Sequence, residues 1–191
     1  MKILELSQYL HQLRYTQTKR AIGYRMTAME IWSLAQLCPK NGINEILVKD
    51  ADLPAPFDGM FVRLANKSGE GDRAVIFVRR SLALHWKEFV IAKELMHCWS
   101  PGESYVTNSS RAKSLVAAFT GKAKKYTALV AGDSMAVVAA AEVMLPLFTL
   151  ERDFAKEIPL EEIAHRHNLH IEVAEMICSL ELIWHRKNGS L

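Results

Sequence analysis

The sequence contains few cysteines, because Cys38, Cys98 and Cys178 are the only three among 191 residues. They stand far apart and form no CxxC pair, so the sequence predicts neither the disulfide framework of a small secreted domain nor a thiolate zinc site. Unpaired cysteines of this kind are typical of a reducing compartment, and we therefore expect a cytoplasmic location.

Long apolar runs are also missing. The first residues, MKILELSQYLHQLR, reach charged side chains too soon for a secretory signal. The most apolar stretch, residues 134–150, is interrupted by Glu142 and Pro146, whereas a membrane-spanning helix needs about 20 apolar residues in a row. We therefore expect a buried helix here and no contact with a membrane.

Charge of one sign is not in large excess, since 24 basic residues stand against 21 acidic ones and the formal net charge is +3. This balance does not favour nucleic acid as a partner. A local basic cluster does occur in the first 26 residues, and we interpret it as the solvated face of a helix: Lys2, Arg14, Lys19, Arg20 and Arg25. Half of the residues are apolar, so the chain is able to bury one sizeable core.

The spacing of apolar residues predicts helices first and then strands. Residues 5–22 repeat apolar side chains every three or four positions, and the capping box TAME at 27–30 starts a second helix. EILVKD, GMFVRL and RAVIFVRR are β-rich, and the polar segment between the last two is typical of a hairpin. We therefore predict the α+β class, with a small antiparallel sheet of about three strands packed against a mainly helical core.

The C-terminal part is expected to be helical. IPLEEIAHRH and HIEVAEMICSLELIWHRK have the pattern of two helices around a short turn. This outline also fits a DNA-binding helix-turn-helix, although Glu172, Glu175 and Glu181 on the second helix would repel phosphates. We divide the chain into a domain of residues 1–150 and a C-terminal helical hairpin of residues 151–191 packed on it.

The segment FVIAKELMHCW, from Phe89 to Trp99, carries the main chemical signal. In an HExxH helix, two histidines four residues apart bind zinc, and the glutamate beside the first activates the bound water. Here Lys93 stands where the first histidine is required, and Glu94 and His97 follow at the proper spacing. Taken alone, these residues also fit the polar face of an ordinary amphipathic helix.

The surroundings of this segment resemble the ImmA/IrrE family of metallopeptidases. LPAPFDG, a hairpin, FVIAKELMH and later AAAEVMLP follow one another, like the family patterns rFtlAHELgH and ExEANrFAaeLLMP, over about residues 50–150. The resemblance implies a zincin-like core, Glu94 as the catalytic base, and His97 and Asp133 as metal ligands. Asp133 takes the place of a longer glutamate ligand, and Met96 takes the place of a glycine.

Lysine replaces the first imidazole ligand at a high electrostatic cost. Its ordinary pKa is near 10.4, so at neutral pH it is a cation without a lone pair. A dication about 4 Å away would be repelled by about 8 kcal/mol at an effective dielectric constant of about 20, which is most of the roughly 10–16 kcal/mol of a structural zinc site. We therefore expect no cofactor, with zinc only if the site is functional.

In the place of the metal we expect an ion pair of Lys93 with Glu94 or Asp133. Asp133 also follows Gly132 and precedes an apolar helix, so it is a candidate N-cap of that helix. The two roles are compatible.

Other histidines do not restore a metal site at this helix. His85 is twelve residues before His97, about 120° around the helix from it. His165, His167 and His170 alternate along the C-terminal hairpin and point to different faces. We interpret these three as solvated side chains.

Three functions remain open. The first is a pseudopeptidase that binds a protein or peptide partner in the former substrate cleft. The resemblance implies a regulatory partner, such as a helix-turn-helix repressor, in a mobile element or a toxin–antitoxin system. The second is an active metal-dependent endopeptidase that cleaves a regulatory protein. The third is a helical DNA-associated module that uses residues 159–187. The replacement of a histidine ligand by Lys93 favours the pseudopeptidase.

Overall fold

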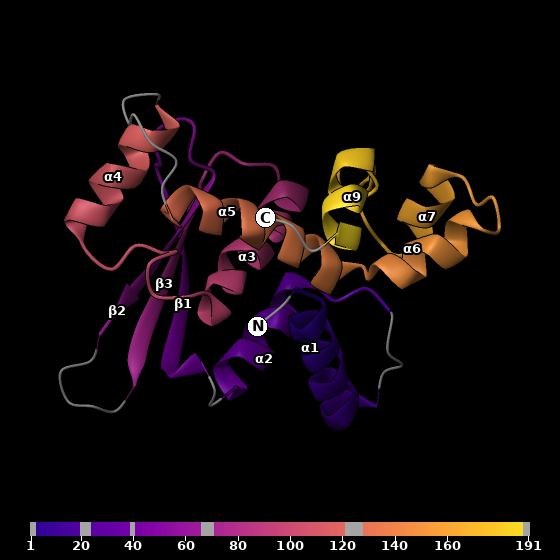
Figure 1. The fold of residues 1–191 in the computed structure, drawn as a ribbon, viewed down its shortest axis with the longest axis horizontal. Coiled ribbons are helices and arrows are strands. Elements are labelled where there is room, and N and C mark those ends of the chain that lie inside the picture. Colours follow the sequence, from indigo (N-terminus) through magenta and orange to yellow (C-terminus); the bar gives the residue numbers. More distant parts are fainter. Residues whose placement is uncertain (1–2, 20–23, 39–40, 66–70, 121–127, 189–191) are drawn as a thin grey trace.

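The computed structural model describes residues 3–19, 24–38, 41–65, 71–120 and 128–188. They form helices around a small sheet (Figure 1), and the α+β class is confirmed. The elements follow in this order: α1 (Ile3–Thr18), α2 (Ala28–Leu37), β1 (Ile43–Ala51), β2 (Gly59–Leu64), β3 (Asp72–Arg79), α3 (Leu84–Met96), η2 (His97–Trp99), α4 (Ser109–Phe119), α5 (Ala128–Met144), α6 (Leu147–Phe154), α7 (Leu160–Arg166), α8 (Ile171–Ile177) and α9 (Leu180–Asn188).

The sheet has the order β1–β3–β2, so the last strand of the sequence lies in the middle. β2 and β3 pair antiparallel, as the hairpin prediction requires. β1 runs parallel to β3, with Ile46 beside Ala74. The prediction of an antiparallel sheet was therefore wrong. β1 and β2 run in opposite directions, but they are not neighbours, because β3 lies between them. β1 therefore pairs with β3, which runs in the same direction as β1.

Helices α3 and α5 pack against each other beside the sheet, while α1 packs on α5 and α2 packs on α3 (Figure 1). The core runs through these layers, as the full burial of Ile76 in β3, Leu95 in α3 and Ala140 in α5 shows. No single helix in the described ranges is long and apolar enough to cross a membrane; α5 and α6 pass that test only as a pair, bent by 60°.

The C-terminal region differs from the predicted pair of helices. Its second helix is broken, because α8 ends at Ile177 and α9 begins at Leu180. The hydroxyl of Ser179 accepts a hydrogen bond from the backbone N–H of Leu182 at 3.3 Å. A serine that caps a new helix in this way competes with continuation of the preceding one.

A buried ion pair joins α9 to α5. The guanidinium of Arg186 donates to Glu142 Oε2 at 2.8 Å and to the carbonyl oxygen of Ala141 at 3.2 Å. Both side chains are almost completely buried. Breaking such a pair would leave a buried charge without its partner, at a cost of about 3–5 kcal/mol. The pair therefore ties the C-terminal helices to the central helix of the core.

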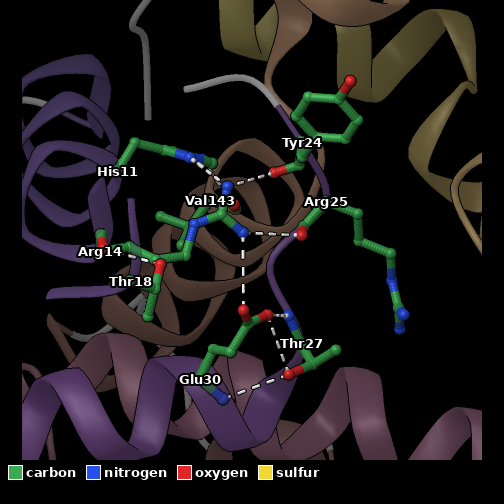
Figure 2. A network of polar contacts seen from close by, with 8 residues as sticks. All are labelled: His11, Arg14, Thr18, Tyr24, Arg25, Thr27, Glu30 and Val143. Atoms are coloured by element: carbon green, nitrogen blue, oxygen red, sulfur yellow. Dashed lines mark hydrogen bonds and ion pairs between the residues drawn. The ribbon is translucent and has the colours of Figure 1, made fainter. Parts of the chain in front are cut away.

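Arg14 is buried, with 1 % of its surface exposed. Its guanidinium donates to the backbone oxygens of Tyr24 at 2.9 Å and Arg25 at 2.8 Å (Figure 2). The interpretation of the basic cluster as a solvated helix face was therefore wrong for Arg14, because carbonyl groups of the segment leading into α2 replace water. It was also wrong for Arg25, which lies between α1 and α2 and pairs with Glu88, with 8 % of its side chain exposed. Lys2 and Arg20 of that cluster lie outside the described residues.

His11 lies beside Arg14 and connects α1 to α5 (Figure 2). Its Nε2 donates to the carbonyl oxygen of Val143 at 3.0 Å, and its Nδ1 faces a guanidinium nitrogen of Arg14 at 3.5 Å. These contacts assign the neutral tautomer with the proton on Nε2. Burial first, and then the charge of Arg14, lower the pKa of His11 to about 4.

We expect the free energy of unfolding to fall as the pH drops from 6.5 to about 4. In this range His11 is protonated in the unfolded chain but stays neutral in the folded protein. His11 alone contributes about 3 kcal/mol to this loss. His11→Gln keeps an N–H for Val143 and does not titrate. Urea unfolding at several pH values should therefore give a slope up to about 1.4 kcal/mol per pH unit smaller in this variant.

The exposed His165 offers a matched control, since His165→Gln removes a histidine that makes no buried contact. This control should keep the pH dependence of the wild type. Equal slopes for wild type and His11→Gln would contradict the assignment of a buried neutral imidazole at position 11.

Candidate functional site

The residues of KELMH lie where α3 ends beside α5. Lys93 and Glu94 belong to the last turn of α3, and His97 begins η2. Asp133 lies inside α5, which already begins at Ala128 in the described part of the chain. The prediction that Asp133 caps this helix was therefore wrong, because the residues before it are helical.

Two glycines allow the neighbouring backbones to approach the site. A Cβ atom on Gly59 of β2 would lie 2.6 Å from Glu94 Oε1, and one on Gly132 of α5 would lie 2.5 Å from the Cβ of Ser104. Both distances are much shorter than van der Waals contact. The close packing of α3 on β2, and of the segment around Ser104 on α5, therefore requires glycine at these two positions.

The structure brings all four predicted site residues together. Lys93 Nζ lies 2.8 Å from Glu94 Oε1 and donates to Asp133 Oδ1 at 2.5 Å. His97 Nε2 lies 3.9 Å from Glu94 Oε2. The exposed fractions of the side chains are 13 % for Lys93, 2 % for Glu94, 26 % for Asp133 and 5 % for His97. The ammonium thus lies between two carboxylates in a largely dry environment.

The protonation states follow from burial and from these charges. Burial alone would lower the pKa of Lys93, but the carboxylates of Glu94 and Asp133 outweigh it and raise this pKa above its ordinary value. Burial also raises the pKa of the Glu94 carboxyl, against the opposing effect of Lys93. Burial and the Lys93 charge lower the pKa of His97 to about 4. At neutral pH the site therefore holds a charged lysine and a neutral histidine.

The space around these side chains is small. A cavity of about 20 Å³ is lined by Gly59, Phe61, Glu94, His97, Tyr105 and Asp133, among others. A volume of this size accommodates about one water molecule. The imidazole Nδ1 of His97 is buried and has no hydrogen-bond partner among the described residues.

The chain itself covers the edge of β2 next to this cavity. Val106 forms a parallel bridge with Val62, and the backbone N–H of Arg63 donates to the carbonyl oxygen of Val106 at 3.0 Å. An extended peptide that approached the cavity along β2 would need the same backbone groups. The segment at Val106 therefore closes this approach.

The donor set does not fit the zinc ion that the resemblance implies. Ligand atoms of Glu94, His97 and Asp133 do lie within 4.8 Å of one another. However, the ammonium of Lys93 lies among them and its pKa is raised, so it offers positive charge and no lone pair. Two protein ligands, His97 and Asp133, are also one fewer than catalytic zinc sites usually have.

Among the remaining histidines, His167 differs from the prediction, whereas His165 and His170 are exposed as predicted. His167 is buried, with Nε2 lying 2.8 Å from Asp153 Oδ2, so its interpretation as a solvated side chain was wrong. His165 is exposed. His85 does not approach His97; its ring stacks on that of His170 at 3.7 Å.

Sequence reasoning missed Arg186 as the partner of Glu142, and it missed the meeting of His85 with the C-terminal helices. These residues are 44 and 85 positions apart in the sequence. No local spacing relates residues at such separations, so the sequence carried no signal for either contact.

Comparisons of the chain with protein-family models, with curated proteins and with solved structures find no match.

Proposed function

We propose that the protein is a pseudopeptidase of the ImmA/IrrE type, which binds a protein or peptide partner and does not use a metal ion. The observation that carries this proposal is the position of Lys93 Nζ between the carboxylates of Glu94 and Asp133, 2.8 Å and 2.5 Å away. The ammonium provides the positive charge that a metal ion would otherwise provide. Without it, the buried carboxylate of Glu94 would be costly.

The closed surroundings favour this proposal over an active endopeptidase. A general base must reach a water and the substrate at hydrogen-bond distance. Glu94 is instead engaged by Lys93, and the adjoining cavity of about 20 Å³ has no room for a peptide bond with its flanking residues. Partner binding at the former substrate cleft is disfavoured for the same reason, so we assign it to another surface.

The surface that we assign to the partner is a groove of about 870 Å³ along β1. Its lining includes three consecutive residues of this strand, Ile46, Leu47 and Val48, together with side chains of α2 and α3. Consecutive strand residues line a groove when it follows the strand edge, since a groove on one face would select alternate residues. β1 pairs only with β3 in the described sheet, so its other edge borders this groove.

The backbone directions show which groups point outward from β1. The indole of Trp32 donates to the carbonyl oxygen of Ile46 at 3.1 Å from the outer side. On the inner side, the N–H of Arg80, which follows β3, donates to Ala51. Because these directions alternate along a strand, the backbone groups of Val48 face outward. We infer that the partner offers an extended apolar segment that adds to β1 as a further strand.

Val48→Pro should weaken such strand addition, because proline has no N–H to donate, while it is still tolerated at a sheet edge. Val48→Thr keeps the N–H and a similar shape, which makes it the matched control. Peptides selected from a displayed library on the wild-type protein should bind Val48→Pro at least about tenfold more weakly, since a hydrogen bond and its neighbours are lost. They should bind Val48→Thr like the wild type. Equal affinity for both variants would contradict strand addition at β1.

The resemblance further favours a regulatory partner, such as a helix-turn-helix repressor in a mobile element or toxin–antitoxin system. The pseudopeptidase assignment itself is tested by zinc binding. We expect no zinc at His97 and Asp133 in the wild-type protein, and zinc binding there after Lys93→His.

A further inference from the structure

A second group of metal-binding side chains lies at the contact between α3 and α8. His85 comes from the first turn of α3, His170 precedes α8, and Glu172 belongs to the first turn of α8. Each residue offers one ligand atom, and these atoms lie within 4.8 Å of one another. Residues far apart in the sequence thus present two imidazoles and one carboxylate to the same point.

The three side chains already contact each other. His85 Nε2 lies 2.9 Å from Glu172 Oε2, and the rings of His85 and His170 are stacked at 3.7 Å with an angle of 7° between their planes. The indole of Trp86 donates to the same carboxylate oxygen at 2.9 Å. A neighbouring donor of this kind orients a ligating carboxylate.

We propose that His85, His170 and Glu172 form a binding site for a divalent transition-metal ion such as Zn²⁺. Two imidazoles and a carboxylate make up a common set of three protein ligands for zinc, which leaves a fourth position for water or an incoming donor. This site goes beyond the proposed function and does not depend on it.

The movement needed to bind an ion is small. Ligand atoms about 2.0–2.2 Å from a tetrahedral zinc ion lie about 3.4 Å apart, so donors now within 4.8 Å must approach by about 1.4 Å at most. Parallel stacked rings direct their lone pairs side by side, so one ring must turn about its Cβ–Cγ bond. His170 is exposed, but its Nδ1 accepts a hydrogen bond from the backbone N–H of Glu172 at 3.4 Å, so turning this ring would exchange that cap of α8 for the metal ion.

The electrostatics differ from those at KELMH. Glu172 pairs with His85 and Trp86 among the described residues, and the nearby Lys87 is engaged by Asp50 at 2.8 Å. Within the described part of the chain, no ammonium therefore takes the position of an ion here, in contrast to Lys93. The chain would bind zinc at an exposed site while its buried site remains closed to it.

A metal ion at this site would connect two helices and would border the groove along β1. An ion bound by His85 on one side and by His170 and Glu172 on the other would join α3 to α8. His85 and His170 also belong to the lining of the groove along β1. The open fourth position of the ion would then be available to a side chain of whatever occupies the groove.

Zinc titration of the metal-free protein, followed by equilibrium dialysis and elemental analysis, tests this inference. We expect saturable binding of about one zinc ion per chain, weakened at least about tenfold by His170→Ala and by Glu172→Gln, since each removes one ligand. His165→Ala removes an exposed histidine of the neighbouring helix α7 and should bind like the wild type. Zinc should raise the melting temperature of the wild type and of His165→Ala, but not of His170→Ala.

Equal zinc affinity in His165→Ala and His170→Ala, or the absence of saturable binding in the wild type, would overturn the site. The outcome is separable from that of the proposed function. Zinc that is lost in His170→Ala supports the exposed site and leaves the role of Lys93 untouched. Zinc that persists in His170→Ala and is lost in His97→Ala would contradict both.

Discussion

Replacing Lys93 with methionine is expected to lower the free energy of unfolding by about 3–5 kcal/mol at pH 7, because it leaves buried carboxylates without their counter-charge. Glu94 is 2 % exposed, and its only close cation among the described residues is Lys93. The carboxyl would have to bind a proton to remain buried, and this costs about 4 kcal/mol at pH 7 relative to an unfolded chain, in which glutamate has an ordinary pKa of about 4.3. Urea unfolding monitored by circular dichroism measures this loss.

The same helix provides a matched control. Lys87 pairs with Asp50 at 2.8 Å, but this carboxylate is half exposed, so Lys87→Met should cost about 1 kcal/mol or less. The double variant Lys93→Met/Glu94→Gln removes the buried negative charge together with the lysine and should recover most of the stability. If Lys93→Met were as stable as Lys87→Met, the ammonium at position 93 would not be neutralising the buried carboxylates.

The positions of the helices and strands were largely predictable from the sequence. Which of these elements pair or pack with one another was not. The β-rich segments and the polar segment between them predicted the antiparallel pairing of β2 and β3, and the capping box at Thr27 was confirmed with both of its hydrogen bonds. These features depend on residues close together in the sequence. The parallel pairing of β1 with β3 was missed, because a β-rich segment shows that it forms a strand but does not show which strand it joins.

The candidate site was predictable to the extent that it is local. Lys93, Glu94 and His97 lie on neighbouring turns, so their spacing alone places them near one another. Asp133 was found only through the family resemblance, which aligns it with a glutamate ligand. Its meeting with Lys93 depends on the packing of α5 against α3, which leaves no trace in either segment taken alone.

Buried charges were the least predictable feature. Arg14 and Arg186 appeared as ordinary basic residues of amphipathic helices, yet both are 1–2 % exposed and bonded to backbone carbonyls. Arginine is usually exposed to solvent, because a buried guanidinium is stable only when several hydrogen-bond acceptors surround it. That convergence is created by tertiary packing and is invisible in the sequence.

Replacing Lys93 with histidine is expected to create zinc binding at the buried site. The substitution removes a repulsion of about 8 kcal/mol for a dication and supplies an imidazole four residues before His97, on the same face of the helix. With Asp133 close by, three protein ligands would then be present, as in catalytic zinc sites. The change in zinc affinity should therefore amount to several orders of magnitude.

The most direct measurement is the zinc content of two proteins purified without chelator, both with His170→Ala so that the exposed histidines do not contribute. With Lys93 in place we predict no zinc, and with Lys93→His we predict about one zinc ion per chain. Zinc bound through His97 and Asp133 while Lys93 is still present would contradict the account, and so would a Lys93→His protein that folds but gains no zinc.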